Sequence, residues 1–235
     1  MIYPMYFDPT YILVIIGMVF SLAAQAGVKS TFSKYSKIGN MRGITGAEAA
    51  ERVLRGAGIF DVRIEHIAGN LTDHYDPKNK VLRLSDTVYG SSSVAAVGVA
   101  AHECGHAIQH AKDYAPLKLR SLLVPVANFG AKIAWPLILI GLLFTSRSST
   151  LFIEIGIIAF LAAVLFHLVT LPVEFNASNR AIRVIADTGM MQGEEIKGAK
   201  KVLNAAAMTY VASAATAVLQ LLRIILLTGG RRRND

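Results

Sequence analysis

The chain has 235 residues, of which 53% are hydrophobic and 17% are charged, and its formal net charge at pH 7 is +8. Soluble domains have about 45–50% apolar and about 25% charged residues, so this composition excludes a disordered chain and favours a membrane protein. A negatively charged membrane surface explains the positive charge better than nucleic acid, and we expect no nucleic-acid partner. The single cysteine, Cys104, excludes an intrachain disulfide and a metal site built from several cysteines.

The first apolar run covers residues 10–28 and contains no charged residue. Its length is close to the roughly 20 residues that a helix needs to cross a bilayer, so we predict a transmembrane anchor over residues 1–28. The alternative is a signal peptide, because Ala24, Gln25 and Ala26 resemble a cleavage site. The absence of Lys and Arg before the run, and the length of the run, disfavour that alternative.

The next segment, residues 29–120, is polar enough for an independent cytosolic α+β unit. Residues 45–48 have the spacing of a capping box, which predicts a short helix after them. Apolar and polar residues alternate over 60–66, and two further apolar stretches, 71–75 and 81–84, flank a turn. These patterns predict a small antiparallel sheet.

A helix is predicted to begin in the serines at 91–93 and to run over residues 94–111, where it contains the motif H-E-x-x-H at His102, Glu103 and His106. Two histidines four residues apart on one helical face can hold one zinc ion. The glutamate between them can take a proton from a water on the ion and pass it to the leaving amine. The alternative is two ordinary histidines of an amphipathic helix, but the strongly helical stretch between apolar runs favours a metal site.

Two further apolar runs, residues 121–146 and 151–171, are separated by residues 147–150, which are predicted to form a very short polar turn. They predict a transmembrane hairpin over residues 121–172. Because a hairpin crosses the membrane and returns, the residues after it are expected on the same side as the H-E-x-x-H helix.

A fourth apolar run, residues 202–222, predicts a C-terminal transmembrane or membrane-packed helix followed by a basic tail, over residues 202–235. A buried helix of a soluble core is the alternative. Lys and Arg are concentrated in residues 29–42 and 180–201, which places these segments in the cytoplasm and the N-terminus outside. Residues 231–233 disagree, because four spans would leave these three arginines outside.

A catalytic zinc site uses three protein ligands, so one more ligand is needed. The predicted third ligand is Glu174, which lies 174 − 106 = 68 residues after His106. It follows the hairpin and opens a predicted cytosolic helix over residues 173–201. His110 is expected to lie too far along the axis of its own helix to share the ion. Glu154 is expected at the opposite membrane surface.

Other residues are candidates for hydrogen bonding near the site or for substrate binding. The edge of the predicted hairpin over residues 71–84 can bind an extended substrate backbone by strand addition, although it could also simply close the sheet. His74 and Tyr75 on this hairpin are candidates for stabilising the oxyanion, with structural roles as the alternative. His110 is a candidate for a hydrogen bond behind the metal ligands.

The stretches DHYDPKNKVLRLSDTVYG, VAAHECGHAIQHA and LPVEFNASNRA resemble the YugP-type membrane zinc metallopeptidases of bacteria, and the resemblance covers nearly the whole chain. More distantly, the chain resembles the HtpX-type proteases, which also place a membrane hairpin between H-E-x-x-H and a glutamate ligand. The resemblance implies a gluzincin-like site, with Zn²⁺ on His102, His106 and Glu174 and with Glu103 as the general base.

The chain departs from the family pattern at Asn176, where an acidic residue is usual. A hydrogen bond that orients a ligand histidine would then be weakened or supplied by another residue, for which Asp187 is a candidate.

The sequence therefore predicts a mainly α membrane protein, with a bundle of about four transmembrane helices and a small α+β zincin-like cytosolic unit. The expected location is a bacterial cell membrane, with the active site facing the cytoplasm. The expected function is zinc-dependent endoproteolysis of membrane or membrane-proximal proteins, in protein quality control. Expected partners are extended polypeptide substrates, membrane lipid, and a second copy or another membrane protein.

Two alternative functions remain open. The first is an intramembrane site-2-type protease, in which H-E-x-x-H lies inside a span. The short apolar stretch before His102, residues 94–101, disfavours it. The second is a non-catalytic scaffold braced by zinc, which leaves Glu103 without a role because a structural site needs no adjacent base.

Overall fold

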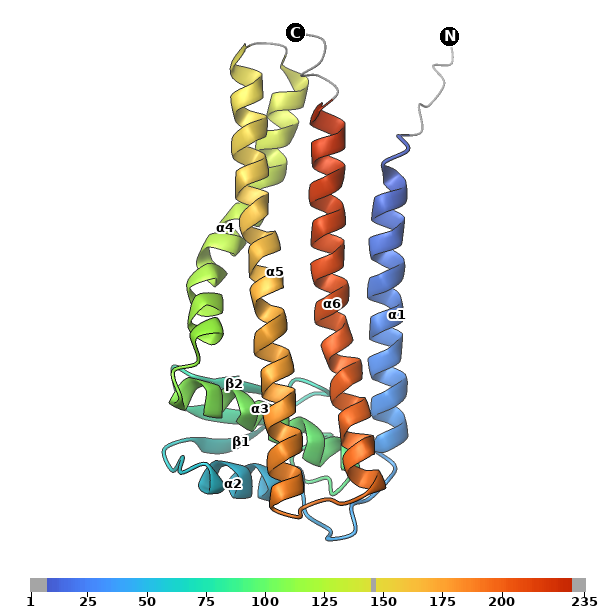
Figure 1. Ribbon diagram of the computed structural model, residues 1–235, viewed down its shortest axis with the longest axis vertical. Helices are drawn as coiled ribbons and strands as arrows, with labels where there is room; N and C mark the ends of the chain where they lie inside the picture. Colours follow the sequence, from blue (N-terminus) through green and yellow to red (C-terminus); the bar gives the residue numbers. More distant parts are fainter. Residues whose placement is uncertain (1–7, 145–146, 230–235) are drawn as a thin grey trace. The chain divides into compact units, whose positions relative to one another are not determined.

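The structure is a computed structural model that describes residues 8–144 and 147–229 (Figure 1). In chain order the elements are α1 (Tyr11–Tyr35), α2 (Gly46–Gly56), β1 (Arg63–Ile67), β2 (His74–Asp76), β3 (Val81–Ser85), α3 (Val94–Ala111), α4 (Ala115–Leu143), α5 (Arg147–Asp187) and α6 (Glu194–Gly229). The predicted class, a mainly α membrane protein with a small sheet, is confirmed. The predicted basic tail at residues 231–233 lies outside the described residues.

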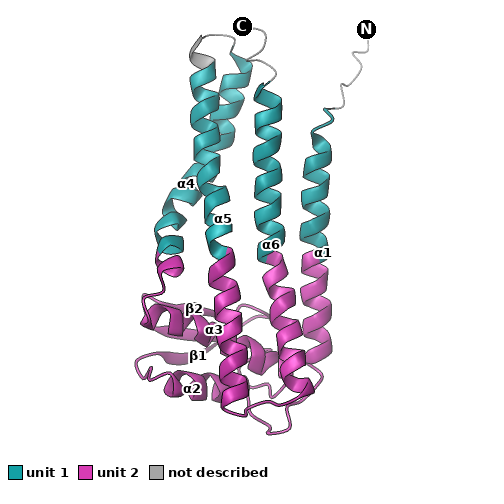
Figure 2. Cartoon of the chain, in the orientation of Figure 1, with its two compact units in different colours: residues 1–23, 119–170, 210–235 teal, residues 24–118, 171–209 magenta. Residues whose placement is uncertain are grey.

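The chain divides into two compact units (Figure 2). Unit 1 comprises residues 1–23, 119–170 and 210–235, and unit 2 comprises residues 24–118 and 171–209. Unit 2 contains α2, α3, the three strands and all residues of the predicted metal site.

Four helices are long and apolar enough to cross a membrane: α1, α4, α5 from Thr150 onward, and α6. They coincide with the four apolar runs of the sequence. The polar stretch at residues 147–150 is not a turn, because α5 already begins at Arg147. Serine and threonine favour turns and helix caps but are also tolerated in a first helical turn, so composition alone did not fix this boundary.

The predicted separate helix over residues 173–201 differs from the structure. α5 continues through Pro172 and ends at Asp187, as one helix of 41 residues. Proline removes one backbone donor, but in long apolar helices the neighbouring groups can compensate for that loss. The chain breaks later, where Gly189 and Gly193 have φ angles of 62° and 53°, a conformation that favours glycine.

Within unit 1, α4 and α5 approach each other closely at glycines. A Cβ atom at Gly130 would lie 2.3 Å from the carbonyl oxygen of Ala159, and one at Gly156 would lie 3.0 Å from the carbonyl oxygen of Ala134. Small residues let helix backbones meet in this way. The buried residues of α4 form one stripe: Ala127, Gly130, Ala134, Ile138 and Gly141.

In unit 2, α2 begins with the predicted capping box. The Thr45 hydroxyl accepts a hydrogen bond from the Glu48 N–H at 3.3 Å, and the Glu48 carboxylate accepts one from the Thr45 N–H at 2.9 Å. This exchange satisfies two backbone donors that a helix start would otherwise leave unbonded. The buried side of α2 then packs on α3.

The three strands form one mixed sheet in the order β1-β3-β2. β2 and β3 are antiparallel, as predicted, but β1 pairs with β3 in parallel, so the prediction of an antiparallel sheet is wrong for β1. Alternation of apolar and polar residues predicts a half-buried strand but carries no information on its direction. The connection over residues 68–73 carries the chain from β1 to the far side of β3, and this leaves β2 at an edge of the sheet.

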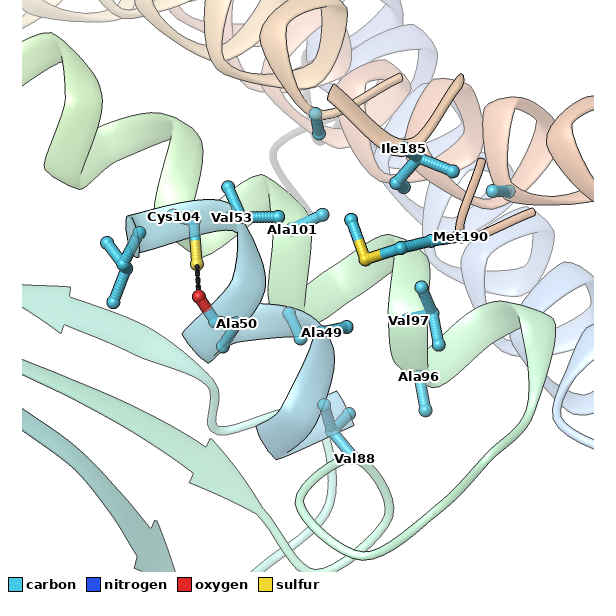
Figure 3. Packing of buried hydrophobic residues seen from close by; sticks show 14 of the residues in the cluster. Ala49, Ala50, Val53, Val88, Ala96, Val97, Ala101, Cys104, Ile185 and Met190 are labelled. Carbon is cyan, nitrogen blue, oxygen red and sulfur yellow. Dashed lines mark hydrogen bonds between the residues drawn. The ribbon is translucent and has the colours of Figure 1, made fainter. Parts of the chain in front are cut away.

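α3 lies in the hydrophobic core of unit 2, and its predicted start is confirmed: the Ser93 hydroxyl caps it by accepting a hydrogen bond from the Ala96 N–H at 3.1 Å. Cys104 is buried against α2, where its thiol contacts the carbonyl oxygen of Ala50 at 3.6 Å (Figure 3). Burial raises the pKa of the Cys104 thiol well above its ordinary value, so this cysteine is unreactive and belongs to the core.

Candidate metal centre

Three side chains from two helices of unit 2 converge on one point. The Nε2 atoms of His102 and His106, on α3, lie 3.3 Å and 3.6 Å from Oε2 of Glu174, on α5. The ligand-type atoms of the three residues all lie within 4.8 Å of one another. The structure therefore brings together the three residues that the sequence selected as metal ligands.

The three residues fit a zinc ion by chemistry and by spacing. Two imidazole nitrogens and one carboxylate are a typical donor set of catalytic zinc sites. Donor atoms about 2.0–2.2 Å from a tetrahedral zinc ion lie about 3.3–3.5 Å from each other, which is close to the two observed nitrogen–oxygen distances. Glu174 is 2% exposed, and a carboxylate this deeply buried calls for a cation beside it.

A glycine inside the motif allows α3 and α5 to approach closely enough for this arrangement. A Cβ atom at Gly105 would lie 2.6 Å from the carbonyl oxygen of Ala177 and 3.0 Å from its Cα atom. Both contacts are with backbone, which a side-chain rotation cannot relieve. Any larger residue at position 105 would push α5, and with it Glu174, away from the two histidines.

The buried side chain of Gln109 determines which nitrogen of His106 faces the centre. The Gln109 amide nitrogen donates to the Val173 carbonyl oxygen at 2.8 Å and to Asn176 Oδ1 at 3.0 Å. Asn176 Oδ1 also accepts a hydrogen bond from Arg180 Nε at 2.7 Å, so its assignment as an acceptor is secure. Gln109 Oε1 must then accept the hydrogen bond from His106 Nδ1 at 3.1 Å, which leaves Nε2 of His106 for a metal.

His102 is held in a similar way by Ser178, which follows Glu174 by one helical turn on α5. The Ser178 hydroxyl lies 3.0 Å from His102 Nδ1 and can accept a hydrogen bond from the Nδ1–H, so that Nε2 again faces the centre. Ser178 is buried, with 7% exposure. Each of the two histidines is thus fixed by a neutral oxygen.

We expect Gln109→Met, which keeps the length of the side chain and removes its hydrogen bonds, to weaken zinc binding about 10- to 100-fold. The His106 ring would lose the acceptor that fixes its tautomer. Competition with a chromophoric chelator measures the change in the purified chain. Gln192→Met, the same substitution at an exposed position, is the matched control. Equal affinity of the Gln109→Met and Gln192→Met variants would contradict this role of Gln109.

Glu103 lies beside the three candidate ligands, between His102 and His106 in sequence. Its Oε2 atom accepts a hydrogen bond from the backbone N–H of Tyr75 at 3.1 Å, and Tyr75 lies on the edge strand β2. Burial raises the pKa of the Glu103 carboxyl, while the two neighbouring histidines act in the opposite direction. The net direction is an increase in the pKa.

The structure places the other predicted residues at different distances from the centre. His110 is exposed and does not face Glu174; its Nδ1 lies 2.9 Å from the Tyr75 hydroxyl. His74 is exposed and contacts Thr72 and Arg83 instead of any ligand.

Asn176 and Asp187, the two candidates for orienting a ligand histidine, differ in outcome. Asn176 hydrogen-bonds to Gln109, which hydrogen-bonds to His106, so Asn176 lies one hydrogen bond further from the candidate metal centre than the resemblance implied. Asp187 is exposed at the end of α5, 187 − 174 = 13 residues or about 20 Å along the helix from Glu174, and cannot orient a ligand.

Sequence reasoning missed Gln109 and Ser178, the two residues that hydrogen-bond to the ligand histidines. Their spacing carried a usable signal, because Gln109 follows His106 by three residues and Ser178 follows Glu174 by four. Residues three or four apart share a helical face, so polar residues at these positions are available to the site.

Comparisons with known proteins agree with this arrangement. Residues 10–229 match a family model described as "Putative neutral zinc metallopeptidase". A protein of Bacillus subtilis (strain 168) named "Putative membrane protease YugP" is 48% identical over 223 residues, which are 94% of this chain and 98% of that protein. No solved structure matches the chain.

Proposed function

Since the chain belongs to the neutral zinc metallopeptidase family, we propose that it is a membrane-embedded endopeptidase with a gluzincin-like centre. In this proposal His102, His106 and Glu174 hold zinc, and Glu103 is the general base. The observation that carries the proposal is the convergence of the three ligand atoms beside a glutamate that is not itself one of them. A purely structural zinc site would be closed by a fourth protein ligand and would need no such base.

The mechanism follows from what the chain's own residues can do. When bound, zinc polarises the scissile carbonyl and makes water more acidic. The Tyr75 N–H holds Oε2 of Glu103, and Oε1 has no protein donor among the described residues, so it is the oxygen that meets the attacking water. Glu103 takes the proton of that water and then gives it to the leaving amine.

Extended polypeptides are the substrate class that this site suits. β2 is an edge strand, and the N–H of its central residue points at Glu103 rather than at β3. A peptide that lies along this edge passes the base with its backbone extended, and such main-chain recognition does not depend on sequence. These features suit cleavage of unfolded or misassembled membrane proteins in quality control.

A multi-pass protein with the metal centre on the cytoplasmic side is the topology that we propose. The homologue is a membrane protease by name, and four helices are long enough to span. Residues 1–9, before the first apolar run, contain no Lys or Arg, whereas residues 29–42, after it, contain several. This difference favours an N-terminus outside. The double variant Cys104→Ala, Lys112→Cys has one cysteine, at an exposed position. This cysteine should react with a membrane-impermeant thiol reagent in inverted vesicles but not in intact cells. Labelling in intact cells would contradict this orientation.

Metal removal tests the proposed activity directly. The purified chain in detergent or nanodiscs should cleave an unfolded protein such as casein. A zinc chelator should abolish cleavage, and a stoichiometric amount of Zn²⁺ should restore it. Bound zinc without any chelator-sensitive cleavage of unfolded or membrane substrates would favour the scaffold alternative. Cleavage confined to bonds inside a transmembrane helix would favour the intramembrane protease.

A further inference from the structure

The exposed side of α4 carries two polar side chains within an otherwise apolar span. Lys132 is the only charged residue between Arg120 and the end of α4 at Leu143, and Asn128 lies about one turn before it. Both side chains are exposed. At 100° per residue they lie on the side of α4 opposite the buried stripe that packs on α5.

Lys132 lies too deep for its charge to reach water along its own side chain. It follows Arg120 by 132 − 120 = 12 residues and precedes the end of α4 by 143 − 132 = 11 residues. These separations are about 18 Å and about 16 Å along the helix axis, farther than a four-carbon side chain extends. Ionisable residues at such depth nearly always pair with another polar group.

The described part of the chain offers Lys132 no such group. In residues 8–144 and 147–229, Lys132 makes no ion pair or side-chain hydrogen bond. A further polar atom lies at the same place, because Pro136 has no N–H to donate to the Lys132 carbonyl oxygen four residues earlier. The side of α4 formed by Asn128 and Lys132 thus presents an ammonium, an amide and a carbonyl without the usual helical donor.

We propose that this side of α4 binds a transmembrane helix of another protein that carries an Asp or Glu carboxylate near the middle of the bilayer. The Lys132 ammonium would pair with the carboxylate, and the Asn128 amide would donate a second hydrogen bond to it. A second copy of this chain fits less well, because a symmetric contact through this side brings two Lys132 ammonium groups together.

The proposed ligand defines a substrate class. A carboxylate exposed at mid-membrane marks a helix that has not assembled with its normal partner, because such groups are otherwise paired inside a bundle. Selection of these helices as substrates rests on the proposed peptidase function. The binding itself does not, so the test measures binding and no activity.

The test uses the full chain in phosphatidylcholine nanodiscs and synthetic leucine-rich transmembrane peptides with a central Asp, Leu or Lys. Fluorescence energy transfer reports association. We expect the Asp peptide to bind about tenfold more tightly than the Leu peptide. Lys132→Met should abolish the difference, Asn128→Leu should reduce it, and Lys132→Arg should retain it. Lys201→Met, the same substitution at an exposed position of α6, is the matched control.

Equal binding of the Asp and Leu peptides to the unsubstituted chain would overturn the proposal, as would full Asp-peptide binding by Lys132→Met. Dimers that form in the unsubstituted chain but not in Lys132→Met would also overturn it, because they would show that a second copy occupies this side of α4. Lys132→Met removes a charge from an apolar helix, so we expect this variant to fold. An inactive but peptide-binding chain would refute the proposed function and leave this inference standing.

Discussion

Glu103→Gln is expected to lower the rate of peptide-bond cleavage by at least about 100-fold, the contribution typical of a positioned general base. The amide keeps the shape of the side chain and can still be held by the Tyr75 N–H. It cannot take a proton from water at neutral pH. The loss should appear in kcat, measured with a quenched fluorescent peptide, and metal analysis should still find one zinc per chain.

The matched control for this variant is Glu51→Gln on the exposed side of α2, where Glu51 pairs with Arg55. Surface pairs of this kind contribute little to stability, so activity should stay unchanged. Wild-type activity in Glu103→Gln would end the assignment of Glu103 as the base. If Glu103→Gln lost zinc as well as activity, Glu103 would be a metal ligand instead of the base.

Glu174→Ala is expected to remove zinc from the purified chain. Without this carboxylate only two protein ligands remain, one fewer than catalytic zinc sites use. The apparent affinity should fall by at least about 100-fold, more than the loss of a residue that only orients a ligand. Competition with a chromophoric chelator measures the loss, and Glu174→Gln tests it without opening a cavity.

Helix content measured by circular dichroism distinguishes loss of the ligand from loss of the fold. Glu51→Ala and Glu51→Gln are the matched controls for the two Glu174 variants. One zinc per chain in both Glu174 variants would move the third ligand to another residue. Such a result would also remove the reason for a buried carboxylate 3.3 Å from His102 Nε2.

Much of this arrangement was predictable because it depends on periodicity and spacing. The capping box of α2 and the cap of α3 follow from short local patterns. The pairing of Glu174 with the histidines followed from counting membrane crossings, an argument that needs no detail of packing. The caps depend on interactions within one helix. The position of Glu174 depends on whether the hairpin returns the chain to the side from which it started.

The remainder depends on contacts between distant segments, which the sequence does not display. The parallel direction of β1 is set by how its connection passes β3. The continuation of α5 through Pro172 depends on neighbours that compensate for a lost donor. The hydrogen bond from Gln109 to Val173 joins residues 173 − 109 = 64 positions apart, so its role emerges only when α3 and α5 pack together.

The neutral oxygens of Ser178 and Gln109 have a consequence for inhibition. In many zinc sites an anionic group accepts the histidine proton and increases electron donation to the ion. Here the dication would be balanced within its ligand set by Glu174 alone, which leaves a net positive charge of one on the ion and its three protein ligands. Inhibitors that carry a single anionic zinc-binding group, such as hydroxamates or phosphonates, should therefore be favoured over neutral thioethers or amides.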